Sequence, residues 1–282
     1  MRLLCVPNWS EGRDAAVLAD MRAALRAHGA NVHFDGADPD HNRIVTAFSG
    51  TEQEVRDTLF AIAAVALKGI DMRRHEGVHP RIGALDVCPL IVLHGSRANA
   101  LDFARGIARD LAEGYDLPVF LYEHSETGKH AADLPSLRRG QFEGMLGREL
   151  DADFGPRAAN PRLGATVLGV RDWLLAMNVD LAEGRLTEAK AIAGEMRVQR
   201  DLGDNRFVGV RALGLPLARR EMTQVSMNLT EPDKVSPDEL VEWIGEREAV
   251  VDTELIGVIR ESDVHRATSL PIRPEQIVKV DS

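Results

Sequence analysis

One short segment holds a high density of side chains that can move protons or bind carboxylates. Residues 71–89 read DMRRHEGVHPRIGALDVCP and contain two histidines, three arginines and three carboxylates among glycines and prolines. Histidine titrates near neutral pH, so it can take up a proton and return it in one reaction. Arginine can hold a carboxylate through two parallel hydrogen bonds. The segment is therefore our first candidate for an active site, and the plain alternative is a capped surface loop.

The same segment contains a pattern typical of zinc hydrolases. Residues 75–79 read HEGVH and match H-E-x-x-H, which binds zinc only on a helix, where positions i and i+4 share a face. Gly77 interrupts the pattern, and Pro80 disfavours a helical conformation at His79. We therefore expect an extended loop and no metal. A zinc hydrolase stays an alternative, which metal bound to the pure protein would support.

The composition restricts the kind of partner. The chain has 282 residues, 44% of them hydrophobic, 28% charged and 5% aromatic, with a formal net charge of −10. These values are ordinary for a globular protein with one or two cores. The sequence has no block of Lys and Arg, so we expect no nucleic acid partner. No apolar run is long enough to span a membrane. Local arginines can still bind an anionic small molecule.

The first residues and the cysteines indicate a reducing compartment. Residues 1–8 read as a strand broken by Pro7 and not as a signal peptide. Cys5 and Cys88 are too few for a disulfide framework. We therefore expect a cytoplasmic protein.

Hydrophobic periodicity predicts the elements that position segment 71–89. The helices are expected from about residue 14 to 29 and, behind a capping box at Thr51 to Glu54, to about 69. The strands are expected at 3–6, 32–34, 44–48 and 84–93. One more helix and a strand at 118–122 follow. Three polar loops, 7–13, 35–43 and 71–86, fall in this half of the chain and are expected to line one ligand site.

The pattern restarts in the second half. After a polar region with a short helix near 134–146, the order β-α-β-β-α-β returns over about 165–259. We therefore expect an α+β fold of two ferredoxin-like (split β-α-β) units with mixed and antiparallel sheets and a ligand cleft between them. The expected units are 1–170 and 171–282. Loop 153–164, with two Gly and two Pro, offers backbone amides to a ligand, but its composition favours an interdomain linker.

Several motifs together resemble a known family. The opening CVPNWSEGR at 5–13 matches the family's C-V-P-N-F-S-E-G-R/K except at Trp9, and segment 71–89 matches a long and specific family block. Further matches are DPDHNR (38–43), LRRGQFE (137–143), DFGP (153–156), GAT (164–166) and QVSMNL (224–229). On these residues the chain resembles glutamate formiminotransferase, the formiminotransferase half of formiminotransferase-cyclodeaminase, from Leu4 to about Gly257.

The resemblance implies a reaction and its participants. The formimino group of N-formimino-L-glutamate would pass to N5 of tetrahydrofolate, giving 5-formiminotetrahydrofolate and L-glutamate in histidine degradation and one-carbon metabolism. Tetrahydrofolate would be the co-substrate, without a metal, in a homodimer. The remaining chain is too short for a cyclodeaminase, so we expect none of that activity. The family's catalytic histidine falls on His79. Its folate-binding loop falls on Gly155, Pro156, Arg157, Ala158, Ala159, Asn160, Pro161, Arg162, Leu163 and Gly164.

The expected chemistry suits a single histidine. N5 must lose a proton when it attacks the amidine carbon, and the leaving nitrogen must gain one, so His79 can act as base and then as acid. Which carboxylate orients its ring, Asp38, Glu76 or Asp86, stays open. The candidates for binding substrate carboxylates are Arg43, Arg81 and Arg171. The candidates for reading the amidine or the pterin edge are Asn8, Asn178, Gln224 and Asn228, and Asp38 is a further candidate for binding substrate. All of these side chains could instead form surface ion pairs or tie down turns.

The sequence departs from the family pattern in two places. The family often has another residue at Asn160, and an aromatic before the Asn of the strand that here reads AMNVD at 176–180. Since both places are expected to contact substrate, one alternative is a folate-dependent formimino or formyl transferase with another amino-acid donor. A further alternative is a non-catalytic module that binds folate or an amino acid.

Overall fold

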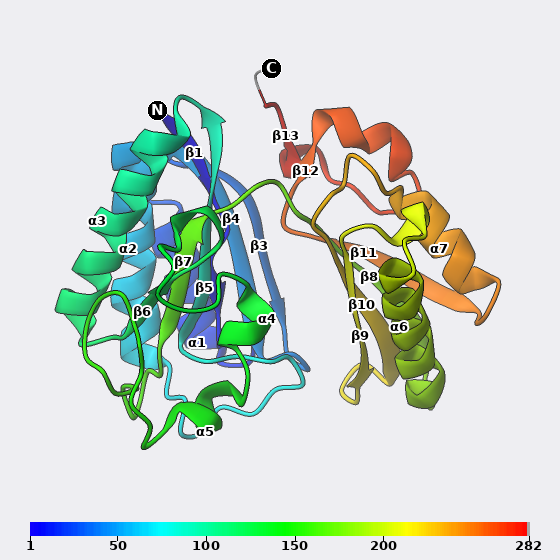
Figure 1. The fold of residues 1–282 in the computed structure, drawn as a ribbon, viewed down its shortest axis with the longest axis horizontal. Coiled ribbons are helices and arrows are strands. Elements are labelled where there is room, and N and C mark those ends of the chain that lie inside the picture. The colour runs from blue at the N-terminus through cyan, green and yellow to red at the C-terminus, as the bar shows by residue number, and fades with distance from the viewer. Residues whose placement is uncertain (281–282) are drawn as a thin grey trace. The chain divides into compact units, whose positions relative to one another are not determined.

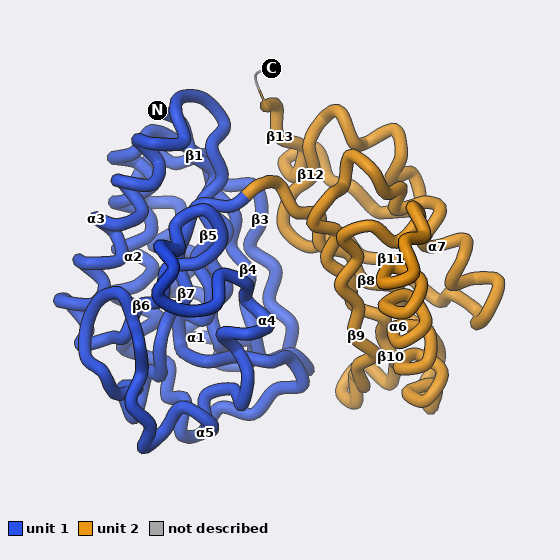
Figure 2. Tube along the Cα trace, viewed as in Figure 1, with its two compact units in different colours: residues 1–171, 281 blue, residues 172–280, 282 orange. Residues whose placement is uncertain are grey.

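The computed structural model describes residues 1–280 and is an α+β structure, as expected. The chain divides into two units, Met1–Arg171 and Asp172–Val280, each with its own hydrophobic core (Figure 2). Residues 281 and 282 of the expected second range lie outside the described residues. Within residues 1–280, no helix combines the length and the apolar character that a membrane crossing needs.

The first unit is built on a seven-stranded mixed sheet (Figure 1). Its strands are β1 (Arg2–Cys5), β2 (Asn8–Trp9), β3 (Asn31–Asp38), β4 (Arg43–Thr51), β5 (Leu85–His94), β6 (Val119–Leu121) and β7 (Thr166–Val170). Both β1 and β2 pair antiparallel with β4 and β5, so they form one strand line that is interrupted at Pro7. β3 lies outside β4, whereas β7 and β6 continue the sheet in parallel beyond β5.

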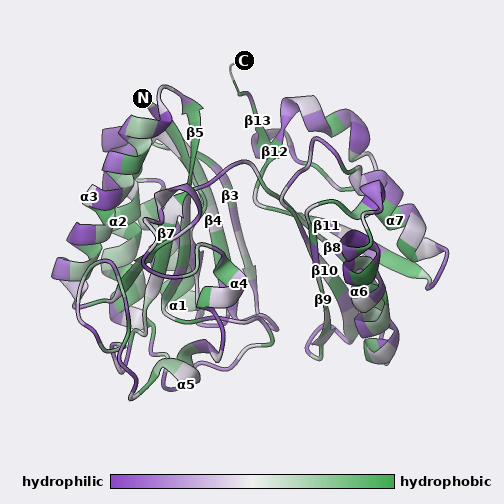
Figure 3. Ribbon diagram, viewed as in Figure 1, coloured by the Kyte–Doolittle hydropathy of each residue, from purple (hydrophilic) through white to green (hydrophobic). Residues whose placement is uncertain are grey.

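The helices of this unit are α1 (Ala15–Leu25), α2 (Glu52–Gly69), α3 (Arg97–Tyr115) and the short α4 (Leu134–Leu137) and α5 (Gln141–Met145), with η1 (Glu123–Ser125). Four of them, α1 to α4, begin at a residue whose side chain caps the first turn. The capping box predicted at Thr51 and Glu54 is confirmed. α4 and α5 replace the single helix expected near 134–146, because Gly140 between them has a positive φ of 84°. In Figure 3, α3 carries both hydrophilic and hydrophobic residues along its length, as an amphipathic helix does.

The second unit is built on an antiparallel sheet of order β11-β8-β10-β9. Its main elements are β8 (Leu175–Ala182), α6 (Leu186–Asp201), β9 (Val210–Leu217), β10 (Met222–Leu229), α7 (Pro237–Gly245) and β11 (Val250–Ile256). Shorter elements are η2 (Asn205–Phe207), β12 (Ile259–Arg260), η3 (Glu261–Arg266), η4 (Pro274–Gln276) and β13 (Ile277–Val278). Along β8, Met177 and Val179 enter the core, while Asn178 and Asp180 lie on the opposite face.

Two expectations about residues 153–170 are wrong. Residues 165–170 do not begin the second unit, because β7 pairs with β5 and β6 in the first sheet. Loop 153–164 is accordingly not an interdomain linker but a connection inside the first unit, where Val119 N donates to Phe154 O. The physical reason is that a short apolar run shows a strand but not which sheet it joins.

Candidate active site

Segment 71–84 is an irregular loop fixed by backbone hydrogen bonds. It contains no helix, so the context that the zinc pattern requires is missing. Met72 N donates to Arg162 O, Val78 N to Asp40 O and Ala84 N to Leu163 O. Among residues 1–280, no group of three or more His, Cys, Asp or Glu side chains is arranged to hold a metal ion.

The three polar loops of the first half meet at this segment. Asn42 connects them, because its Oδ1 accepts from Gly12 N at 2.9 Å and its Nδ2 donates to Glu76 O at 3.0 Å. Ser10 Oγ donates to Gly83 O at 2.7 Å. Gly77 is required for the close approach, since a Cβ there would lie 2.2 Å from His41 O. The expectation that these loops line one site is consistent with this packing.

The hydrogen bonds of His79 define its tautomer. Nδ1 lies 2.9 Å from Pro80 O, and Nε2 lies 2.9 Å from Arg43 Nη1. A carbonyl only accepts and a guanidinium only donates, so Nδ1 carries the proton and the Nε2 lone pair accepts from Arg43. The ring of His41 stacks on that of His79 with centroids 5.5 Å apart. His79 is therefore a neutral imidazole whose basic nitrogen is already bound.

The surroundings keep His79 neutral. Burial lowers its pKa well below the ordinary value, and the nearby charges of Arg43 and Arg138 lower this pKa further. The hydrogen bond to Pro80 O acts in the opposite direction but is weaker. The expectation of an orienting carboxylate is not met, because the carbonyl of Pro80 occupies Nδ1.

His75 and Arg81 form a bonded pair beside His79. His75 Nε2 donates to Asn42 O at 2.7 Å, so His75 Nδ1 accepts from Arg81 Nε at 3.1 Å. The other four N–H donors of Arg81 bind His75 O, Gln141 Oε1 and both carboxylate oxygens of Glu143. All five donors of this buried guanidinium are thus used inside the first unit. Arg81 fixes the loop, which weakens the prediction that it binds a substrate carboxylate.

Two of the three candidate carboxylates, Asp86 and Asp38, also serve the local backbone. Asp86, which is 2% exposed, accepts from Ile82 N at 2.8 Å and from Arg138 Nη2. Asp38 Oδ1 accepts from the backbone N of Asp40 and of His41, each at 2.8 Å. Both therefore shape the loops that present His79.

The remaining candidates lie apart along the chain. Asn8 Nδ2 donates to Val6 O at 3.1 Å and holds its own turn. Arg171, at the end of the first unit, hydrogen-bonds Tyr122 and lowers a phenol pKa that burial raises. In the second unit, Asn178 Nδ2 donates to Glu254 Oε2 and Gln224 Nε2 to Asp180 Oδ1, whereas Asn228 is exposed. None of these contacts tests the predicted binding roles.

The predicted folate loop, residues 155–164, is anchored to the histidine loop and to α2. Arg162 donates to Leu67 O at 2.7 Å and to Ile70 O at 2.8 Å. Asn160 N and Gly164 N bond each other's carbonyls, and Asn160 Oδ1 accepts from the next amides, Arg162 N and Leu163 N. The amides of these four residues are therefore used within the loop, so for these four the expectation of free amides is wrong.

Sequence reasoning assigned no role to three residues that shape the site. They are His41, from the loop before β4, Arg138, at the end of α4, and Glu143, in α5. They act on His79, Asp86 and Arg81 respectively. The only available signal was that the motifs at 38–43 and 137–143 contain them.

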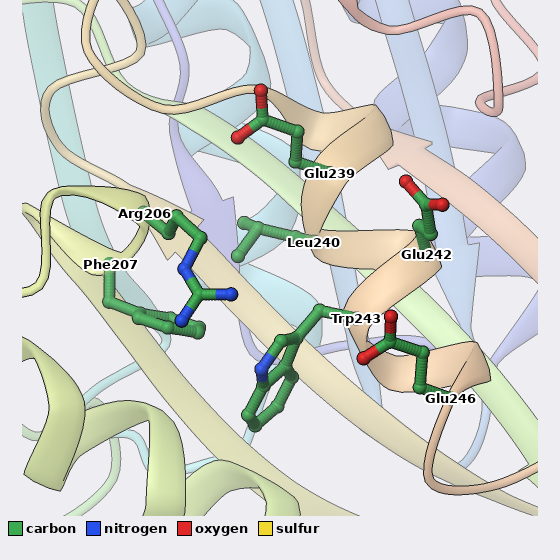
Figure 4. A pocket seen from close by; sticks show the side chains of 7 residues that line it. All are labelled: Arg206, Phe207, Glu239, Leu240, Glu242, Trp243 and Glu246. Atoms are coloured by element: carbon green, nitrogen blue, oxygen red, sulfur yellow. The ribbon is translucent and has the colours of Figure 1, made fainter.

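A hollow lies in the second unit, between η2 and α7 (Figure 4). Its volume is about 150 Å³, and Arg206, Trp243, Glu239 and Glu246 are part of its lining. Asp204 binds Arg206 and raises its pKa, to which both glutamates contribute. The negative charges of Glu239 and Glu246 are thus partly balanced by Arg206. None of the predicted site residues lines this hollow.

Comparison with known proteins identifies the family. The protein-family model described as "Formiminotransferase domain, N-terminal subdomain" matches residues 2–171 of the sequence. The chain is 33% identical over 238 residues to the glutamate formimidoyltransferase of Streptococcus pyogenes serotype M1, covering 82% of this chain and 78% of that protein. Over 270 residues it is 33% identical to the glutamate formimidoyltransferase of Thermoplasma acidophilum, covering 91% and 88%. It is also 37% identical over 235 residues to the formimidoyltransferase-cyclodeaminase of Sus scrofa, covering 80% of this chain and 43% of that relative. The chain therefore belongs to the formiminotransferase family.

Proposed function

We propose that this protein transfers the formimino group of N-formimino-L-glutamate to N5 of tetrahydrofolate, with His79 as the catalytic residue. The observation that carries the proposal is a neutral, partly buried imidazole, held by Pro80 O at 2.9 Å, within a matched formiminotransferase subdomain. The relatives named glutamate formimidoyltransferase support glutamate as the carrier of the group.

The proposed mechanism needs one proton carrier. As N5 bonds to the amidine carbon, His79 Nε2 takes the N5 proton. As the bond from that carbon to the glutamate nitrogen breaks, the imidazolium returns the proton to this nitrogen. Pro80 O holds Nδ1–H throughout, so the ring keeps one orientation and one tautomer. Arg43 is the candidate for binding a carboxylate of the formimino donor, because its guanidinium already lies beside Nε2 of His79, the nitrogen that takes the proton.

The finer assignments belong to the same proposal. We assign residues 1–170 and 171–282 to the N- and C-terminal formiminotransferase subdomains, both ferredoxin-like. The sheet order β11-β8-β10-β9 with α6 and α7 supports this for the second unit. Residues 155–164 would contact tetrahydrofolate, and no metal would take part. The ligand cleft, the homodimer and the cytoplasmic location are proposed from the resemblance, and sedimentation of the pure protein tests the homodimer.

The test is an absorbance assay with tetrahydrofolate and N-formimino-L-glutamate, in which acid converts the product to methenyltetrahydrofolate. His79→Ala should lower kcat by about 10²-fold or more, the usual contribution of a general base, with tetrahydrofolate binding retained. A variant that keeps kcat within about tenfold of wild type would remove His79 from the mechanism. If the wild type binds tetrahydrofolate but does not turn over, formimino-aspartate and formimino-glycine test another donor. Absence of tetrahydrofolate binding would overturn the proposed function.

A further inference from the structure

The base nitrogen of His79 is not open to a substrate in the arrangement described. Arg43 Nη1 lies 2.9 Å from Nε2, and the opposite nitrogen is committed to Pro80 O. Nε2 is therefore the only ring nitrogen that can take a proton, and it is bound by a cation that cannot give its own proton up.

The space beside this nitrogen is also too small for the reacting group. The cavity lined by His41, Arg43, His75 and His79 has a volume of about 10 Å³. Such a volume admits at most one water molecule. A formimino group, –CH=NH, has one carbon and one nitrogen atom, each about as large as a water molecule. Within this pocket it can reach Nε2 only if a side chain moves.

Movement of the Arg43 side chain would both uncover Nε2 of His79 and enlarge the cavity beside it. His79 Nδ1 is fixed by its own chain, and His75 and Arg81 are tied to each other and to Glu143. Arg43 also reaches His41 Nδ1, but at a longer 3.4 Å. Once Nε2 is protonated, it too is a donor, so Arg43 can no longer stay opposite to it.

A carboxylate is the ligand that would take Arg43 from the imidazole. A guanidinium forms two parallel, charge-assisted hydrogen bonds with a carboxylate but only one bond with a ring nitrogen. We propose that Arg43 is a carboxylate-operated latch on His79, which covers Nε2 until a carboxylate of the donor takes the guanidinium. The proposal rests on the proposed function for the identity of the donor. It makes Arg43 a specificity-determining residue, since only a donor with a suitably placed carboxylate exposes the base.

The experiment measures the exposure of His79 directly, with diethylpyrocarbonate, which acylates unprotonated imidazole nitrogens. Modification of each histidine is followed by mass spectrometry at neutral pH, and exposed His28 serves as an internal reference. Glutarate is the probe, because it has the two carboxylates of the glutamate skeleton but no transferable group. Arg43→Met is compared with Arg13→Met, whose guanidinium donates to Pro39 O.

The latch predicts a specific pattern. In Arg43→Met, His79 should react at least about tenfold faster than in wild type, as expected when a hydrogen bond to a charged donor is lost. Arg13→Met should leave the His79 rate unchanged. Glutarate should accelerate modification of His79 in wild type and not in Arg43→Met, with His28 unaffected in both.

Two results would overturn the proposal. One is equal reactivity of His79 in wild type and Arg43→Met. The other is glutarate that slows the wild-type reaction, or leaves it unchanged up to concentrations well above those of cellular amino acids. No turnover is measured, so the latch can fail while formimino transfer is intact, and it can be present in a protein that uses another donor.

Discussion

Arg162 should be the main attachment of loop 155–164 to the rest of the first unit. Its guanidinium donates to Leu67 O at 2.7 Å, to Ile70 O at 2.8 Å and, at a longer 3.4 Å, to Lys68 O. These carbonyls end α2, where the helix has no further amides to satisfy them and where the helix dipole favours a cation. The proposed substitution is Arg162→Met, which keeps much of the side-chain length but none of the donors.

The structure sets the size of the effect. Each short hydrogen bond from a charged donor contributes about 1.5 kcal/mol or more, and partial exposure of Arg162 reduces the sum of the two. We expect a loss of about 2 kcal/mol in the free energy of unfolding, or about 4–8 °C in the Tm of a unit of this size. Arg157 is the matched control in the same loop. It is 70% exposed and pairs with the exposed Glu149 at 3.0 Å, so Arg157→Met should cost at most about 1 kcal/mol.

Differential scanning calorimetry of wild type and the two variants, at equal pH and salt, measures the difference. Arg162→Lys should fall between wild type and Arg162→Met, because it keeps the charge near the end of α2 but loses the fork that spans two carbonyls. If Arg162→Met and Arg157→Met lower Tm equally, the contacts with α2 contribute no more than a surface ion pair and the reasoning fails.

Three further outcomes follow from backbone geometry, from pKa and from burial. Gly164→Ala should lower the free energy of unfolding in urea by about 2 kcal/mol or more, since φ is +75° and the new Cβ would lie 2.1 Å from Ile82 O. Gly106→Ala in α3, whose new Cβ meets no atom within 4 Å, should instead raise this free energy by about 0.5–1 kcal/mol. The lowered pKa of His79 means that the unfolded chain binds this proton first as pH falls, so its contribution to stability is complete above about pH 6.5 and is lost below it. The Tm of His79→Gln should therefore fall less than that of wild type between about pH 7 and pH 5, and an equal fall would contradict the assignment. Cys5 and Cys88 are fully buried and burial raises the pKa of Cys5, so both thiols should react with a disulfide reagent only after unfolding; fast reaction in the native protein would be the contrary result.

Local chemistry made much of the fold predictable. The Thr51–Glu54 capping box and the helix expected from about residue 14 both appear in the structure, where Asp14 caps α1. Sheet membership was not predictable, because β7 has the same apolar pattern in either unit and only its partners β5 and β6 place it. Periodicity describes one element at a time, whereas pairing depends on residues far along the chain.

The candidate site was also predictable only in part. Gly77 and Pro80 around His79 correctly indicated a loop without a helix, since both act through their own backbone. The partners of the side chains did not follow from spacing. Glu143 binds Arg81 across 62 residues and Arg43 binds His79 across 36. A sequence offers several carboxylates for each histidine, and it does not show that a neighbouring carbonyl takes their place.

That a carbonyl, and not a carboxylate, holds Nδ1 has a chemical consequence. A carboxylate at this position would favour the imidazolium and raise the pKa of the ring. Pro80 O fixes the tautomer without that charge, while burial, and after it the charges of Arg43 and Arg138, keep the pKa of His79 low. A pKa far below the working pH also makes a weak base, since a general base is most effective when its pKa lies near that pH. A carboxylate that binds Arg43 would neutralise one of the two cations and so raise the pKa of His79. The donor would then strengthen the base as well as expose it.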